Sequence, residues 1–247
     1  MNLGLSSISF RTFLTSSADE SIALVTYRQK RFDVKRTKVS NYFRWMTQPV
    51  RPKVILAGHE SEIFSLNTES HEILRKTPAM VVDSISSMAL APNKRHLAIA
   101  RKSPDAILIY DLERDKLLRT LEGHSANLHA LKYSDDGKML ASGSMDGSVL
   151  IWDPETARQF HKYSDGEHAV TALCFFGRNR GLISVSGGKR VVFVDVLGRK
   201  RISTIEASEP IETIALSHDE AKLAIGHVGG LVTLWDIEAV ARHFERK

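Results

Sequence analysis

The feature that most constrains the fold is a short apolar run that ends in an aspartate and recurs at a nearly fixed interval. The run ends at Asp111 in AILIYD, Asp153 in VLIWD, Asp195 in VVFVD and Asp236 in LVTLWD. The steps between these positions are 42, 42 and 41 residues. Self-similarity at a period of about 40 residues is typical of proteins built from one repeated supersecondary unit. The sequence therefore predicts a repeat architecture.

The same position in the pattern is found twice more towards the N-terminus. Asn67 in SEIFSLN stands 44 residues before Asp111, and Thr26 in DESIALVT stands 41 residues before Asn67. Six units then cover almost the whole chain, and we expect one domain over residues 1–247. The predicted units span approximately residues 5–35, 36–80, 84–122, 123–165, 166–207 and 208–247.

Within each unit, strand-like runs alternate with turn signals, and the fourth unit shows this best. Its runs are NLHALKY, KMLASGS, SVLIWD and FHKY. The turns between them contain Asp136-Gly137 and Asp146-Gly147, which tolerate the positive φ that tight hairpins demand. Four antiparallel strands in about 40 residues predict a propeller blade, and hence an all-β fold with about six blades.

The segment from Gly123 to Asp153, GHSANLHALKYSDDGKMLASGSMDGSVLIWD, resembles the repeat of the WD40 β-propeller family almost throughout. The likeness extends over residues 84–247 by strand spacing and partial signature, and over residues 1–83 by the period alone. It implies that four side chains join in a structural hydrogen-bonded chain, and not in a catalytic triad, because buried polar groups must satisfy one another. These residues are His124, Ser142, Asp146 and Trp152.

The resemblance leaves the closure of the propeller open, because propellers of this family mostly have seven blades. Three outcomes are consistent with the sequence: a six-bladed ring, a ring completed by a strand or blade from a partner, or a chain shortened relative to a longer relative. Unpaired strand edges invite strand addition, which gives the second outcome a physical motive.

Signals for enzymatic chemistry are weak, and we expect no catalytic residue, no metal site and no cofactor. Cys174 lies in the centre of a predicted inner strand, where a buried inert thiol is expected. The ten histidines show no metal-binding spacing. A single cysteine, no N-glycosylation acceptor and no long apolar run favour an intracellular protein without a membrane span. Nuclear, nucleolar and cytoplasmic locations all remain open.

Basic residues are the most informative polar pattern, in a chain with a formal net charge of +5. In a propeller, the loops joining strands one to two and three to four emerge on the same side of the ring. This rule places two groups on one rim, suited to phosphates or acidic peptides; the alternative is a solvated rim without a ligand. The groups are Arg28, Lys30 and Arg31, and Arg178, Arg180, Arg199, Lys200 and Arg201.

These observations favour a non-catalytic scaffold or adaptor that binds other proteins. The resemblance implies a multiprotein or ribonucleoprotein assembly, and family members with basic rims often belong to RNA processing or ribosome biogenesis. Few aromatic residues accompany the basic loops, so contact with RNA backbone or with structured RNA is expected in preference to reading of bases. The alternative is a receptor for acidic or phosphorylated peptides, of the substrate-adaptor type.

Overall fold

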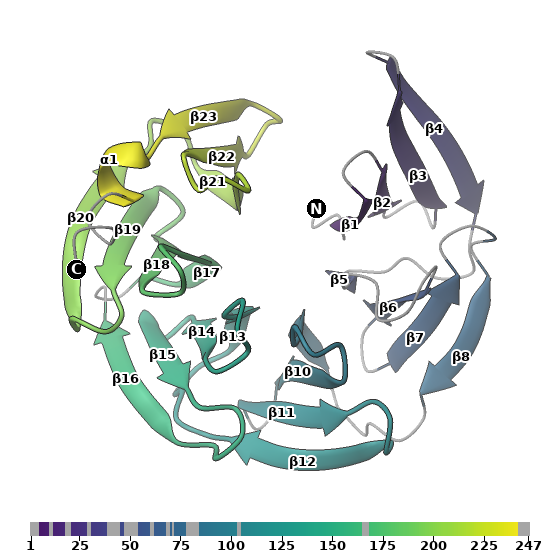
Figure 1. The fold of residues 1–247 in the computed structure, drawn as a ribbon, viewed down its shortest axis with the longest axis horizontal. Coiled ribbons are helices and arrows are strands. Elements are labelled where there is room, and N and C mark those ends of the chain that lie inside the picture. The colour runs from purple at the N-terminus through teal and green to yellow at the C-terminus, as the bar shows by residue number, and fades with distance from the viewer. Residues whose placement is uncertain are drawn as a thin grey trace. The chain divides into compact units, whose positions relative to one another are not determined.

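The computed structural model describes residues 5–9, 12–17, 21–28, 31–38, 45–46, 54–59, 62–67, 70, 72–77, 84–102, 105–164 and 168–241. These residues form six consecutive antiparallel sheets, named A to F in chain order, each built from strands that follow one another in the sequence (Figure 1). Five sheets have four strands, and sheet F has three strands within the described residues. This is the topology of propeller blades.

The strands of sheets A to C are β1 to β12. Sheet A contains β1 (Leu5–Ser9), β2 (Thr12–Ser17), β3 (Ser21–Arg28) and β4 (Arg31–Lys38). Sheet B contains β5 (Trp45–Met46), β6 (Val54–His59), β7 (Glu62–Asn67) and β8 (Ile73–Thr77). Sheet C contains β9 (Ile85–Leu90), β10 (His96–Arg101), β11 (Ala106–Asp111) and β12 (Lys116–Leu121).

The strands of sheets D to F are β13 to β23. Sheet D contains β13 (Leu128–Tyr133), β14 (Leu140–Ser144), β15 (Ser148–Trp152) and β16 (Gln159–Ser164). Sheet E contains β17 (Val170–Phe176), β18 (Gly181–Ser186), β19 (Arg190–Asp195) and β20 (Lys200–Glu206). Sheet F contains β21 (Ile211–Leu216), β22 (Lys222–His227) and β23 (Val232–Asp236), and the short helix α1 (Glu238–Ala241) follows it.

The chain divides into two compact units. One comprises residues 1–104 and 108–118, and the other comprises residues 105–107 and 119–247. In the first unit, sheets B and C share an apolar core that includes Leu56, Ile63 and Ile99. In the second unit, β13, β17 and β21 lie at the inner edge of their sheets, and β16 and β20 lie at the outer edge (Figure 1).

The recurring aspartate closes the turn that follows the third strand of a sheet. The Oδ1 atom of Asp111 accepts hydrogen bonds from the backbone N–H of Glu113 and Arg114, each at 3.0 Å. Asp153 and Asp195 accept corresponding bonds at 2.9 Å and 2.7 Å, from Glu155 and Gly198. Aspartate favours such local turns because its short side chain reaches the backbone two or three residues ahead. The period in the sequence is thus the period of one turn motif.

Sheet E buries both of its faces, because it packs between sheets D and F. Leu182 faces sheet D and packs with Val149 and Ile151. Ile183 faces the other way and packs with Leu223 and Ile225 of sheet F. Successive strand residues point to opposite faces, so a strand buried on both sides reads as an unbroken apolar run. The run LISVS of β18 has this character and is buried throughout.

The predicted all-β propeller fold is confirmed, with one difference in the blades. The expectation of four strands holds for sheets A to E, whereas sheet F has three within the described residues. The edge strand β23 exposes Val232 and Leu234, at 64% and 71% of their full accessible areas. Strand β3 also continues two residues beyond Thr26, to Arg28. Among the described residues, no helix is long and apolar enough to cross a membrane.

Candidate functional sites: a buried polar chain and a cavity between sheets D and E

The four polar residues singled out in the fourth unit come together at the face of sheet D that packs away from sheet E. Trp152 Nε1 donates to Ser142 Oγ at 2.8 Å, and Ser142 Oγ lies 2.7 Å from His124 Nε2. His124 Nδ1 lies 3.0 Å from Asp146 Oδ2, which also accepts the backbone N–H of Ser125 at 2.9 Å. The chain therefore ties the segment before β13 to the second and third strands of the sheet.

Burial and hydrogen bonding set the protonation states of His124 and Asp146 in this hydrogen-bonded chain. Burial lowers the pKa of His124 and outweighs the opposing hydrogen bond and charge of Asp146. Burial works against ionisation of the Asp146 carboxyl, but hydrogen bonds from Ser148, Ser125 and His124 prevail and lower its pKa. A neutral imidazole then donates from Nδ1 to the carboxylate and accepts the Ser142 hydroxyl proton at Nε2.

The order Ser142, His124, Asp146 matches that of a hydrolytic triad, but the surroundings do not. Ser142 is 0% exposed, and its oxygen already accepts the indole N–H of Trp152. A nucleophile needs open space for a substrate and donors for the developing oxyanion. The buried hydroxyl has no such space, so the arrangement acts as a structural clamp.

The predicted basic residues of the fifth unit gather at one end of sheet E. Phe176 pairs with Gly181, Gly181 with Asp195, and Asp195 with Lys200, so the turns 177–180 and 196–199 lie at the same end. Four of the five basic side chains in or beside these turns are exposed, and one is half-buried. They are Arg178, Arg199, Lys200 and Arg201, and the half-buried Arg180.

Neighbouring turns hold the first of these loops in place. Asn179 Oδ1 accepts the backbone N–H of Asp135 in sheet D at 2.9 Å. The backbone N–H of Gly177 donates to Glu220 Oε2 beside sheet F at 2.7 Å. Residues 177–179 all have positive φ, and the contacts on either side fix this tight conformation. The turn that carries Arg178 and Arg180 is thus tied to both neighbouring sheets.

The basic residues predicted in the first unit belong to the other compact unit. Arg28 ends β3 and Arg31 begins β4, and the two residues pair across the hairpin. Lys30 lies outside the described residues. A basic arc shared by these residues and sheet E remains a prediction.

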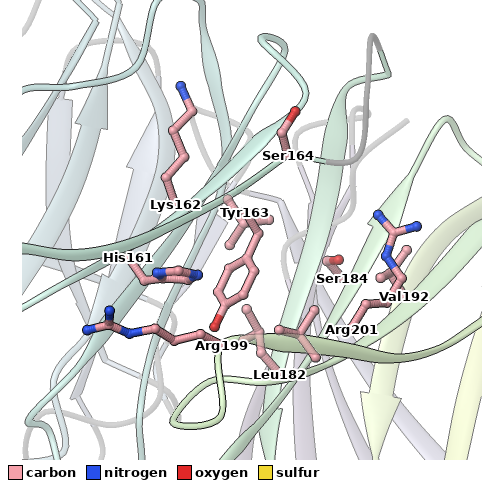
Figure 2. A pocket seen from close by; sticks show the side chains of 11 residues that line it. His161, Lys162, Tyr163, Ser164, Leu182, Ser184, Val192, Arg199 and Arg201 are labelled. Carbon is pink, nitrogen blue, oxygen red and sulfur yellow. The ribbon is translucent and has the colours of Figure 1, made fainter.

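A cavity of about 280 Å³ lies between sheets D and E, towards their outer strands (Figure 2). Its apolar walls are Val149 on one side and Leu182, Val192 and Val194 on the other. Polar and basic groups complete the lining. They are His161, Lys162, Tyr163 and Ser164 of sheet D, and Ser184, Arg199 and Arg201 of sheet E.

The 42-residue repeat explains why there is space here. Adding 42 to the number of Trp152 gives Val194, and Leu140 pairs with Trp152 in register just as Leu182 pairs with Val194. In sheet D the indole reaches to within 3.0 Å of where a side chain on Gly123 would begin. In sheet E the much smaller valine leaves that volume unfilled. The same offset aligns Ser184 with Ser142, but sheet E has no indole to which the Ser184 hydroxyl could bond.

Tyr163 forms a fixed wall of the cavity. Its hydroxyl donates to the Val196 carbonyl at 3.1 Å, and its ring packs edge-on against His161, with ring centres 4.2 Å apart. Burial, reinforced by Asp195, raises the pKa of Tyr163 to about 12. Burial also lowers the pKa of His161, with a further contribution from the charge of Arg199. At neutral pH the positive charge of the lining therefore comes from Arg199 and Arg201, since the side chain of Lys162 extends away from the cavity (Figure 2).

Other candidate chemistry has little support in the described residues. Cys174 is half-buried in β17, and burial raises the pKa of its thiol, which disfavours the reactive thiolate. No group of three or more His, Cys, Asp or Glu within the described part of the chain is placed to hold a metal ion.

Comparison with known families agrees with this geometry. The family described as WD domain, G-beta repeat matches residues 115–153, which run from the end of sheet C through β15. This match covers one repeat, and together with the series of blade-like sheets it supports a WD40-repeat β-propeller for this chain. Propellers of this family are in general non-enzymatic scaffolds for protein interactions.

Sequence reasoning reached part of the cavity and missed the rest. Arg199 and Arg201 were selected as rim residues, whereas Tyr163, Ser184 and Val194 were not selected. The signal that could have found Val194 is the offset itself, because VVFVD lacks the tryptophan of VLIWD at the aligned position. No comparable signal marks Tyr163, since only packing brings β16 against sheet E.

Proposed function

We propose that this protein is a scaffold of a ribonucleoprotein assembly and that the basic end of sheet E contacts RNA. The observation that carries the proposal is the gathering of Arg178, Arg199 and Lys200 at one end of the sheet, all exposed. Exposed arginine and lysine neutralise phosphates without reading bases. RNA processing or ribosome biogenesis is the setting that fits such a surface in this family.

The proposal is tested by reversing charge at the second turn. Changing Arg199, Lys200 and Arg201 together to Glu should abolish retention on heparin and flatten the salt dependence of RNA binding, because each lost phosphate contact reduces the salt slope by about one. The circular dichroism spectrum should stay unchanged, since these side chains are exposed. Retention that is equal to that of the native chain at every salt concentration would contradict the proposal.

A pull-down from native extract, with and without RNase, distinguishes RNA-mediated from direct partners. Loss of partners on RNase treatment supports the ribonucleoprotein assignment. A partner that survives in fixed stoichiometry would instead indicate a protein scaffold with a direct contact surface. The edge strand β23, with exposed Val232 and Leu234, offers such a surface to a completing strand.

The second candidate function is a receptor for acidic or phosphorylated peptides. The cavity between sheets D and E favours it, because it combines apolar walls with basic groups at a partly open mouth. RNA on the basic end and a peptide at the cavity would share Arg199 and Arg201, so the two functions differ in which additional residues they require.

A further inference from the structure

Ser184 lacks the hydrogen-bonding partners that the aligned serine of sheet D has. The residue is 3% exposed and lines the cavity, and its hydroxyl has no hydrogen bond to any residue that the structure describes. In sheet D, the corresponding Ser142 bonds with both Trp152 and His124. Because Ser184 lines the cavity, its hydroxyl can take a hydrogen-bonding partner only from there, either water or a ligand. The cavity into which Ser184 opens is where a hydrogen-bonding partner fits.

The charge of the lining indicates what kind of partner this is. None of the eleven described residues that line the cavity is acidic, and its cations are Arg199 and Arg201, because the side chain of Lys162 extends away from the cavity (Figure 2). Figure 2 shows Arg201 on the same side of Tyr163 as Ser184, with Arg199 and His161 on the other side. The 42-residue offset aligns Arg201 with Gln159 of sheet D, whose side chain packs close to Gly123 and the indole of Trp152. Sheet E therefore has a guanidinium where sheet D has a neutral amide.

We infer that the cavity between sheets D and E is a binding pocket for a phosphomonoester carried on a side chain of a partner peptide. Ser184 donates its hydroxyl proton to one phosphate oxygen, and Arg201 pairs with the others. Valine walls border the phosphate on one side, and the exposed Arg201 pairs with it at the open mouth of the cavity in a charge-assisted bond. The inference rests on the second candidate function, a receptor for acidic or phosphorylated peptides, and names the pocket that holds the phosphate group.

Size and shape favour a monoester over an RNA backbone. A volume of about 280 Å³ is just below the range for pockets that hold drug-sized ligands, so the cavity suits a small group. A phosphorylated side chain presents three oxygens at the end of a single stem, so it can enter between two sheets. A phosphodiester carries a sugar on each side and has to lie along an open surface, such as the basic end of sheet E.

The test uses the full chain and four probes, measured by titration calorimetry. The probes are a short Gly/Glu peptide with one central phosphoserine, its unphosphorylated twin, inorganic phosphate, and an oligouridylate with unphosphorylated ends. The phosphopeptide should bind and the twin should not, and inorganic phosphate should compete with the phosphopeptide. Binding of the twin with equal affinity, or failure of phosphate to compete, would overturn the inference.

Three variants locate the binding. Val194→Trp fills the cavity with the side chain that sheet D carries, and should abolish phosphopeptide binding. Ser184→Ala removes one hydroxyl with little effect on packing, and should weaken binding by about tenfold or more. Arg201→Gln should also weaken it strongly. The matched control is Arg178→Gln, which loses the same charge outside the cavity and should bind the phosphopeptide as the native chain does.

The same variants separate this inference from the proposed function. Val194→Trp should retain oligouridylate binding and heparin retention, because the basic end of sheet E is unchanged. Phosphopeptide affinity that is the same in Val194→Trp and Ser184→Ala as in the native chain would overturn the pocket and leave the RNA surface standing. Loss of oligouridylate binding in Val194→Trp would show that RNA, and not a phosphopeptide, occupies the cavity. The circular dichroism spectrum of each variant is the control for folding.

Discussion

Sheets D and E are successive copies of one repeat, and they solve the same packing problem in different ways. Sheet D fills the space beside its third strand with Trp152 and links it through Ser142 to His124 and Asp146. Sheet E has Val194 at the aligned position and keeps a cavity there, with a buried serine that no longer has its indole. The comparison teaches that one side chain at a repeated position decides whether the space beside the third strand is filled or left as a cavity.

The largest expected effect comes from removing the indole of sheet D, so that sheet D has a cavity where sheet E has one. Trp152→Ala should lower the free energy of unfolding by about 3 to 5 kcal/mol, because the indole is buried and its loss leaves a cavity and removes one hydrogen bond to Ser142. Chemical denaturation measures the change. The control is Val194→Ala, which should cost less than half as much because the side chain already borders empty space. An unchanged denaturation midpoint for Trp152→Ala would contradict the clamp.

A smaller effect is expected where sheets D and E are joined. Tyr163→Phe removes the hydroxyl that donates to the Val196 carbonyl and should cost about 0.5 to 1.5 kcal/mol of unfolding free energy. The matched control is Tyr133→Phe, since the buried Tyr133 hydroxyl has no hydrogen-bond partner among the residues described. This control should cost nothing or stabilise slightly. Equal losses in the two variants would mean that the hydroxyl of Tyr163 does not join the sheets.

The smallest effect is a pH dependence confined to sheet D. The pKa of His124 in the folded protein lies below its ordinary value of 6.5, so the unfolded chain binds more protons as the pH falls. The stabilising contribution is full above pH 6.5 and is lost as the pH falls towards the folded pKa. Between pH 7 and 6 only the upper part of this titration is crossed, and the loss should be small.

The pH effect is assigned by comparing the native chain with His124→Asn. Thermal unfolding at both pH values should show a smaller decrease in melting temperature for the variant, because residue 124 then no longer titrates. A decrease of equal size in both proteins would indicate that other histidines carry the pH dependence. His161 is the nearest alternative in this region, because burial lowers its pKa as well.

The two candidate sites differ in how far the sequence could predict them. His124, Ser142, Asp146 and Trp152 lie within one repeat, and their spacing in the chain already indicates that they meet. The basic end of sheet E was also within reach, because alternating loops of an antiparallel sheet share one end. The cavity was not predicted, because its lining comes from two sheets and depends on a volume that is absent. The absence of a large side chain at residue 194 does not produce a sequence motif that could be recognised.

The sequence alone determined the repeat and its turns. The aspartates at 42-residue and 41-residue steps, the Asp-Gly turns and the apolar runs each act over a few neighbouring residues, so local chemistry specifies them. Only the tertiary structure decided what lies between the blades. Tyr163 and Val194 belong to different sheets, and the packing of one sheet on the next brings them to the same cavity. Packing depends on the shapes of both partners at once, which no single stretch of sequence contains.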